Sequence, residues 1–143
     1  MNSAKGAGMK HFRQILTITT DDVEQFLNLS YEVEECVRRS MINEGICVVA
    51  SQHTTSAVFL ENDNECLYHD WKELLDKVTN VETEYEVDYI NRGQQHLKQI
   101  LLGSSVTIPI SDGKLDLGPR QYIMYGDFDG MREKYVIVKI IGE

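Results

Sequence analysis

The sequence has no long hydrophobic run, little proline and no paired cysteine motif. Its 143 residues include only 2 prolines and 3 cysteines. No apolar stretch approaches the roughly 20 residues that a membrane-spanning helix needs. The cysteines are odd in number and lack CxxC spacing, which argues against a disulfide framework or a cysteine-built zinc site. We therefore expect a cytoplasmic protein that does not span a membrane.

An excess of basic residues is also missing. The chain has 23 acidic and 14 basic residues, for a formal net charge of −9. Nucleic-acid backbones and anionic membranes both require basic patches, so neither is expected as the main partner. The sequence contains no P-loop, GxGxxG or GxSxG motif. The familiar nucleotide-loop enzymes and serine hydrolases are therefore poor fits.

The length and composition suit a single globular domain. Hydrophobic residues make up 42% and charged residues 26% of the chain, close to the globular average. A domain of this size can bury a stable core without disulfides or metals. We predict one domain over residues 9–143, preceded by residues 1–8 as a flexible leader or cloning remnant.

The apolar pattern predicts an α+β domain dominated by antiparallel strands, a sheet or sandwich with two to three helices. Strands are expected at residues 11–19, 23–29, 46–50, 57–60, 106–110, 121–127 and 135–141. Asp112 and Gly113 have the composition of a tight hairpin turn. Residues 79–93 are polar and acidic and are predicted to form a long loop, which in a compact domain is often functional.

Capping residues and apolar periodicity predict where the helices begin and end. The first helix is expected to be capped by Ser30 and stopped by Gly45. The second is expected to begin with Asn62 in a capping box. Its buried face is predicted to consist of Leu67, Trp71, Leu74, Leu75 and Val78. The third is expected to open at His96 and to stop at Gly103.

The segment from Gln52 to Ser56 is the most informative for function. A buried strand leads directly into His53 and three hydroxyl residues, Thr54, Thr55 and Ser56. In one interpretation the hydroxyls satisfy neighbouring backbone groups and His53 is a half-buried structural residue. In the other, His53 is a metal ligand or an acid/base group, and the hydroxyls hold an anionic substrate.

A second histidine and a group of carboxylates extend the candidate site. His96 lies at a predicted helix start, where free N–H groups attract anions, although it also fits an ordinary surface histidine. Only tertiary structure can bring it to His53. Glu61, Asp63 and Glu65 offer a third metal ligand or a general base, or simply cap the second helix.

The segment Asp127-Phe128-Asp129-Gly130 forms the other acidic cluster. Asp129 and Gly130 alone are ordinary turn residues. Arg132 follows them, and its guanidinium has the geometry to bind a phosphate or a carboxylate with two hydrogen bonds.

Several motifs together resemble the YjbQ family, small proteins often described as secondary thiamine-phosphate synthases. The matching segments are residues 52–56, 96–98, 101–109, 112–118 and 121, and then Phe128-Asp129-Gly130 with Arg132. The resemblance runs from about Phe12 to Glu143, nearly the whole domain.

The resemblance implies a β-rich α+β fold that assembles as a homotrimer, and a pocket with histidines that is compatible with zinc or magnesium. It implies weak thiamine-phosphate synthase activity, which joins a pyrimidine pyrophosphate to a thiazole phosphate and expels pyrophosphate. His53 and His96 match family histidines, as metal ligands or acid/base groups, and Asp129 and Arg132 match the FDG-R segment. Our leading hypothesis is an enzyme that acts on a small phosphorylated molecule, which Arg132 and the hydroxyls of residues 54–56 hold.

Two departures from the family pattern favour an alternative. Val87 and Gln94 stand where many members have histidine. A catalytic zinc site usually has three protein ligands, so Glu61, Asp88 or Glu65 would have to supply the third. The alternative hypothesis is a non-catalytic, trimeric, small-ligand-binding protein with a degenerate metal site.

Overall fold

A computed structural model describes residues 8–79 and 93–143 of the chain. Nearly all of the predicted loop at 79–93, including Val87 and Asp88, lies outside these residues, as do residues 1–7 of the predicted leader. The elements are β1 (Lys10–Ile18), β2 (Gln25–Asn28), α1 (Ser30–Ser40), β3 (Gly45–Ser51), β4 (Ser56–Glu61), α2 (Glu65–Thr79), α3 (Gly93–Leu102), β5 (Ser105–Ser111), β6 (Lys114–Leu115), β7 (Tyr122–Asp127) and β8 (Lys134–Gly142). The predicted α+β fold is confirmed.

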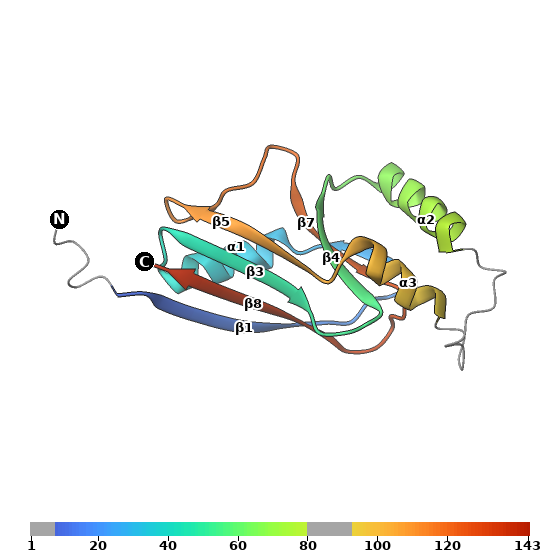
Figure 1. Ribbon diagram of the computed structural model, residues 1–143, viewed down its shortest axis with the longest axis horizontal. Coiled ribbons are helices and arrows are strands. Elements are labelled where there is room, and N and C mark those ends of the chain that lie inside the picture. Colours follow the sequence, from blue (N-terminus) through green and yellow to red (C-terminus); the bar gives the residue numbers. More distant parts are fainter. Residues whose placement is uncertain (1–7, 80–92) are drawn as a thin grey trace.

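The strands form two antiparallel sheets. The larger has the order β1-β8-β3-β5-β6, and the smaller has the order β2-β7-β4. Figure 1 shows the larger sheet with α1 behind it, and α2 and α3 at the end where β4 lies. Most strand pairs join segments that are distant in sequence, such as β1 with β8.

The main core fills the space between α1 and the two sheets. The spacing of Val33, Cys36, Val37 and Met41 predicts one apolar face for the first helix. The first three form the buried face of α1, whereas Met41 lies past the helix end and is exposed. The three buried residues belong to one buried cluster with side chains from both sheets, including Val58 and Ile123 of the smaller sheet. Burial of this apolar surface supplies the main driving force for folding.

A second core covers the opposite face of the smaller sheet. Phe26 and Phe128 pack there with Leu75 and Trp71 of α2. The Phe26 ring lies edge-on to the Trp71 ring at a centroid distance of 5.2 Å. Because both faces of the smaller sheet are covered, the strand ends that carry the candidate site are held firmly between two cores.

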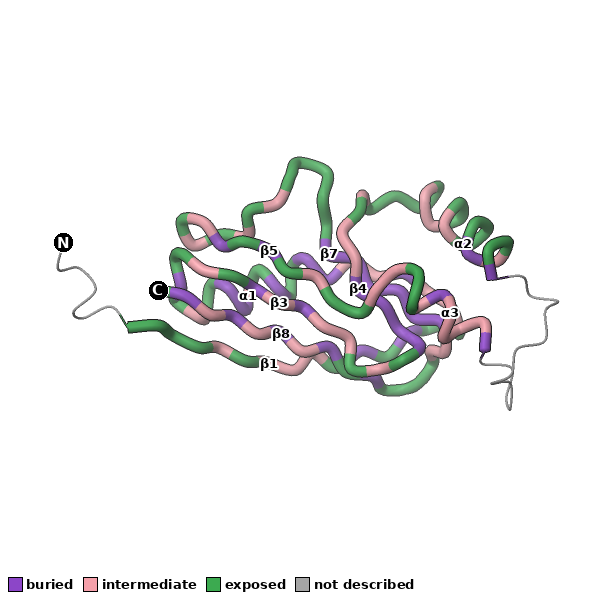
Figure 2. The backbone as a smooth tube through the Cα atoms, viewed as in Figure 1, coloured by how far each residue is buried: buried purple, intermediate pink, exposed green. Residues whose placement is uncertain are grey.

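Burial alternates strictly along β8, so Lys134, Val136, Val138 and Ile140 share the buried face. The same alternation of buried residues with less buried ones is visible along the larger sheet in Figure 2. A lysine is therefore the first inward-facing residue of an otherwise aliphatic strand face.

The predicted ends of the first helix are wrong. Ser30 is the first helical residue, and its hydroxyl accepts a hydrogen bond from the Ile123 amide at 2.9 Å rather than capping the helix. Met41 ends the helix in the left-handed conformation, with φ 59°. Gly45 belongs to β3 instead, where a Cβ atom would lie 2.1 Å from the carbonyl oxygen of Ile141.

The cap and the buried face of α2 and the start of α3 also differ from the predictions. Asn62 lies before α2 without capping it, and the Asn64 side chain accepts a hydrogen bond from the Cys66 amide at 2.8 Å. Leu74 and Val78 are more than half exposed, so the predicted apolar face of α2 is only partly buried. Helix α3 starts three residues before His96, and its predicted stop at Gly103 (φ 90°) is confirmed.

Within residues 8–79 and 93–143, no helix has the length and apolar character needed to cross a membrane. All three cysteines are free thiols, and Cys36 and Cys47 are buried in the core. Burial raises the pKa of the Cys47 thiol to about 12.

Candidate functional site

His53 lies in the turn between β3 and β4, and hydrogen bonds fix the backbone of this turn. The amide of His53 donates to Ser51 Oγ at 3.2 Å, and the amide of Ser56 donates to the His53 carbonyl at 3.5 Å. The neighbouring amide of Gln52 donates to the carbonyl of Tyr135 in β8 at 3.1 Å. The imidazole lies beside the Tyr135 ring, with centroids 5.8 Å apart.

The His53 imidazole is half-buried, and its Nε2 atom is buried without a hydrogen-bond partner among the described residues. Burial is the largest cause that lowers the pKa of His53, and the positive charges of Lys134 and Arg132 lower it further. Both effects favour the neutral imidazole, with a nitrogen that is available to a ligand or to a proton in transfer.

Lys134 lies under this turn and is completely buried. Its Nζ donates to Asp127 Oδ1 at 2.6 Å, to Thr55 Oγ1 at 2.9 Å and to Ser56 Oγ at 3.0 Å. An ammonium group has three N–H donors, so all of them are used. Burial lowers the pKa of Lys134, and the carboxylate of Asp127 opposes that shift.

Tyr125 closes the network on the other side. Its hydroxyl lies 3.0 Å from Ser56 Oγ and 3.2 Å from Asp127 Oδ2. Since a carboxylate only accepts, the tyrosine donates to Asp127 and accepts from Ser56. Burial raises the pKa of the Tyr125 phenol well above its usual value. Together Thr55, Ser56, Tyr125, Asp127 and Lys134 form what we call the Lys134 network.

The Asp127–Arg132 loop is attached to the same network. The amide of Asp129 donates to Asp127 Oδ1 at 3.1 Å, and the amide of Phe128 donates to the Thr55 carbonyl at 3.0 Å. Arg132 donates from Nη2 to Asp129 Oδ2 at 2.8 Å and from Nε to the Asp129 carbonyl at 3.3 Å. Two of its five N–H groups are used in these bonds.

The close packing around Gly130 explains why the loop has a glycine at this position. A Cβ atom at Gly130 would lie 2.1 Å from Thr20 Oγ1 and 2.6 Å from the carbonyl oxygen of Asp22. The amide of Met131 donates to the same Thr20 hydroxyl at 3.0 Å. The loop thus packs closely against the turn before β2, which fixes the position from which Arg132 extends.

The structure divides the predicted substrate-binding residues into two kinds. Thr54 and Arg132 are exposed, whereas Thr55 and Ser56 are buried and accept hydrogen bonds from Lys134. Asp129, predicted to be catalytic, is half-buried and bound to Arg132. Of these predicted residues, Thr54 and Arg132 are therefore the ones that are open to solvent, and His53 is half-buried.

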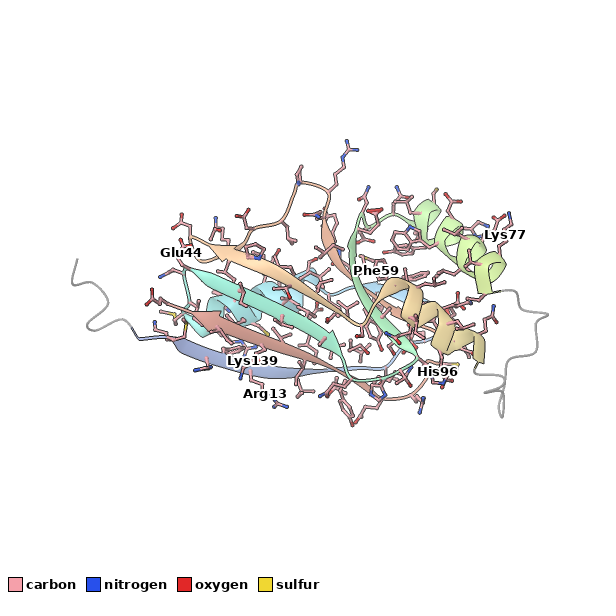
Figure 3. The ribbon with its side chains drawn as sticks, viewed as in Figure 1. Arg13, Glu44, Phe59, Lys77, His96 and Lys139 are labelled. Carbon is pink, nitrogen blue, oxygen red and sulfur yellow. The ribbon has the colours of Figure 1, made fainter. Side chains whose placement is uncertain are left out.

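His96 is half-buried on α3, which packs against β4, and Figure 3 shows it on that helix near the start of the strand. Among the described residues, no hydrogen bond or ring contact joins His96 to His53. Residues 8–79 and 93–143 contain no group of three or more His, Cys, Asp or Glu side chains placed to hold a metal ion. The described part thus does not supply a complete zinc or magnesium site, and the metal stays a prediction.

The sequence interpretation placed Asp127 in an acidic cluster without its buried partner, and it missed Lys134 and Tyr125. The available signal was the period-two pattern of β8, which places Lys134 in phase with Val136 and Val138. A charged residue on the apolar phase of a strand needs a partner, because an unpaired buried charge is costly.

A second buried lysine lies on α3. Lys98 is 3% exposed, and its Nζ donates to Asp76 Oδ1 at 2.7 Å and to Glu24 Oε2 at 3.0 Å. Lys72 also binds Asp76, at 3.0 Å. The Lys98 ammonium lies over the Phe128 ring, 5.7 Å from its centroid. We call Lys98, Glu24, Asp76 and Lys72 the Lys98 cluster; it joins α2 and α3 to the turn before β2.

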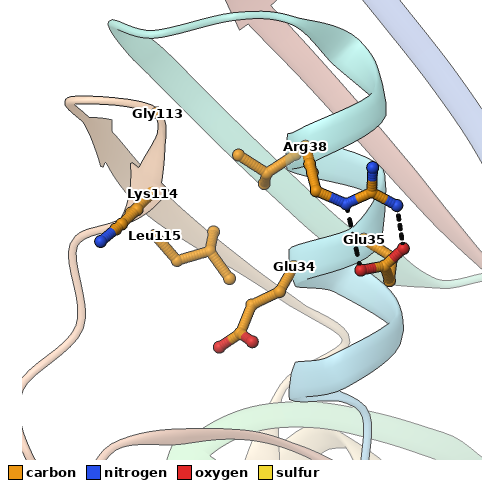
Figure 4. A pocket seen from close by; sticks show the side chains of 7 residues that line it. Glu34, Glu35, Arg38, Gly113, Lys114 and Leu115 are labelled. Carbon is orange, nitrogen blue, oxygen red and sulfur yellow. Dashed lines mark hydrogen bonds and ion pairs between the residues drawn. The ribbon is translucent and has the colours of Figure 1, made fainter.

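A separate cavity of about 460 Å³ lies between α1 and the β5–β6 hairpin. Glu34, Glu35, Arg38 and Lys114 line it, as Figure 4 shows. Arg38 binds Glu35 with two hydrogen bonds, one of them 3.3 Å long from Nε. The polar lining contains both charge signs, so no single ligand chemistry is indicated.

Comparison with known proteins identifies relatives over most of the chain. The family model described as "UPF0047 protein YjbQ-like" matches residues 14–143. A UPF0047 protein of Methanothermobacter thermautotrophicus is 31% identical over 139 residues, which cover 96% of this chain and 97% of that protein. A UPF0047 protein of Archaeoglobus fulgidus is 34% identical over 127 residues, 88% of this chain and 98% of that protein.

Solved structures share the fold closely. A protein of Sulfolobus solfataricus, described as YbjQ-like and of unknown function, superimposes with a TM-score of 0.91 at 27% identity. The match covers 95% of this chain and all of that one. An uncharacterised conserved protein of Clostridium acetobutylicum gives a TM-score of 0.84 at 34% identity, over 89% of this chain and 98% of that one.

Proposed function

The chain belongs to the YjbQ-like UPF0047 family, and from that premise we propose that it is an enzyme that acts on a small phosphorylated molecule at the His53 turn. The observation that carries the proposal is the buried, unpartnered Nε2 of His53, next to the positive charges of Lys134 and Arg132. A neutral imidazole beside two cations suits an anionic group that must be held and released.

The proposed reaction is a thiamine-phosphate synthase-like displacement. The thiazole nitrogen of one substrate attacks the methylene carbon of a pyrimidine pyrophosphate, so that a C–N bond forms and the C–O bond to pyrophosphate breaks. The leaving pyrophosphate takes both electrons of the broken bond. Arg132 and the Thr54 hydroxyl would bind its oxygens, since a guanidinium forms strong charge-assisted hydrogen bonds to phosphate.

The neutral imidazole of His53 would donate an N–H hydrogen bond to the leaving group, where negative charge develops. His96 would act as an acid/base group from α3, and Asp129 would orient Arg132 through the hydrogen bonds at 2.8 Å and 3.3 Å.

We also propose that the protein is a homotrimer. The outer face of the larger sheet supports self-association, because none of the described helices covers it. Ile46 is 45% exposed there and pairs across the sheet with Ile141, and Ile15 pairs with Ile137. An Ile46→Lys variant should lower the molar mass measured by light scattering from that of a trimer to that of a monomer.

The activity is tested by pyrophosphate release from the pyrimidine pyrophosphate and the thiazole phosphate. His53→Gln and Arg132→Gln should each reduce the rate by about 100-fold, the usual scale for a lost acid/base or oxyanion-binding group. His69→Gln on α2 is the control, because His69 is exposed and outside the proposed site. Equal rates in all three variants and in the wild type would refute the proposal.

The second candidate is a non-catalytic binding protein, and Val87 and Gln94 favour it because the family histidines are missing there. It predicts that pyrophosphate raises the melting temperature of the wild type while no turnover occurs. Turnover that depends on His53 would exclude it.

A further inference from the structure

The Lys134 network has no side chain that would contact the substrate in the proposed reaction, although the Lys134 charge acts on His53. Lys134 is fully buried, and each of its three donors already has a partner within 3.0 Å. It therefore has no donor left for a substrate. A buried charge of this kind is costly to keep, which raises the question of what it does.

The network contacts both segments that carry the proposed site. Through Thr55 and Ser56 it holds the end of the turn that carries His53. Through Asp127 it holds the start of the loop that carries Arg132, since Asp127 Oδ1 also accepts from the Asp129 amide. One ammonium group therefore links two segments that are more than 70 residues apart.

The backbone of β8 supports the same turn from the other face. Lys134 and Tyr135 are consecutive, so their side chains extend to opposite sides of the strand. The Tyr135 ring lies against the His53 imidazole, and the Tyr135 carbonyl accepts from the Gln52 amide. The start of β8 thus contacts the His53 turn on both sides.

We infer that Lys134 is a positioning residue that fixes His53 relative to Arg132 by bonding Thr55, Ser56 and Asp127. This inference rests on the proposed function for its purpose, but its physical content concerns the free protein. Without the ammonium group, the three oxygens that it binds would lose their hydrogen-bond donor. The His53 turn and the Arg132 loop would then no longer be bonded to the same group.

The test is the nuclear magnetic resonance signal of the His53 imidazole in the ligand-free protein. The chain has four histidines, so His53→Gln assigns the signal by its disappearance. Lys134→Met should displace or broaden this signal. Lys98→Met is the matched control, because it removes the other buried lysine and two ion pairs but no hydrogen bond to either segment of the network. The contact of Lys98 with these segments is limited to the Phe128 ring, whose centroid lies 5.7 Å from the Lys98 ammonium.

A His53 signal that keeps its wild-type position in Lys134→Met, or that moves equally in Lys98→Met, would overturn the inference. If Lys134→Met does not fold, Tyr125→Phe decides, since it removes only the hydroxyl that joins Ser56 to Asp127. It should displace the His53 signal in part, and an unchanged signal would then overturn the inference.

The proposed function is tested separately in the same samples by adding inorganic pyrophosphate. Lys134→Met should raise the dissociation constant of pyrophosphate about tenfold, which corresponds to a loss of about 1.4 kcal/mol in binding free energy. If the wild type binds no pyrophosphate while the His53 signal still depends on Lys134, the proposed function fails and the positioning role stands.

Discussion

Lys134 and Lys98 are both buried, yet they have different kinds of partners. Lys134 has one fully buried carboxylate and two hydroxyls, whereas Lys98 has two carboxylates whose side chains are 20% and 32% exposed. Water can therefore reach the partners of Lys98 if the lysine is lost. It cannot reach Asp127, so the two lysines should differ in stability and in function.

The difference also shows what each cluster connects. The Lys98 cluster joins helices α2 and α3 to the turn before β2, which is a packing role. The Lys134 network joins two strand ends that carry the proposed ligand-binding side chains. A buried ion pair is by itself weak evidence of a stabilising role. We expect the main role of the Lys134–Asp127 pair to be holding the two segments in a fixed relative position.

The largest expected effect on stability is that of Lys134→Met. It leaves the Asp127 carboxylate buried without its cation, which typically costs about 3–5 kcal/mol. The free energy of unfolding, measured by urea denaturation, should fall by that amount. The double variant Asp127→Asn with Lys134→Met should be more stable than Lys134→Met alone, and a further loss instead would contradict a paired charge.

Lys98→Met should cost less. Asp76 keeps Lys72 as a partner at 3.0 Å, and Glu24 is partly solvated, so we expect a loss of about 1.5–3 kcal/mol, the scale for hydrogen bonds to charged groups. The same urea experiment measures it. A loss equal to that of Lys134→Met would remove the distinction between the two lysines.

Tyr125→Phe tests the edge of the Lys134 network. The change removes one hydrogen bond to Asp127 and one to Ser56 but keeps the ion pair, so the expected loss in unfolding free energy is about 1–2 kcal/mol. Tyr31→Phe on the exposed side of α1 is the control, and it should change stability very little.

The smallest expected effect is a pH dependence that comes from His53. Its pKa in the folded protein lies below the usual value near 6.5, so the unfolded chain binds the proton more readily. The contribution of His53 to the free energy of unfolding is constant above about pH 6.5. It is lost as the pH falls from 6.5 through the pKa of His53 in the folded protein. The difference in stability between wild type and His53→Gln should therefore shrink over that range. A difference that grows with acidification would mean that the folded state binds the proton more tightly.

The sequence predicted the elements better than their arrangement. Alternating apolar residues located the strands, and the Asp112-Gly113 turn was confirmed because both residues have the positive φ that a tight hairpin requires. Which strands pair could not be read locally, since β8 lies between β1 and β3 and the contacts span most of the chain. The predicted Ser30 and Asn62 caps were wrong because each side chain accepts a hydrogen bond from an amide outside the helix start, Ser30 from Ile123 of β7 and Asn62 from Asp63.

For the candidate site, the sequence located the His53 turn and the Arg132 loop but not what connects them. The predicted strand began at residue 135, so Lys134 lay outside it, although its phase with Val136 places it on the buried face. Its need for Asp127 and Ser56 follows from burial, which depends on β7 and β4 packing against the core. The position of His96 relative to the turn was likewise beyond local pattern, and among the described residues no hydrogen bond or ring contact joins it to His53.

The most direct test of the central claim is the His53 imidazole signal during a titration of the wild type with inorganic pyrophosphate. If the His53 turn and Arg132 form an anion site, the signal should shift saturably, and Arg132→Gln should weaken the response while the His69 signal stays unchanged in both proteins. A His53 signal that stays fixed up to millimolar pyrophosphate would contradict the assignment of this turn as the functional site.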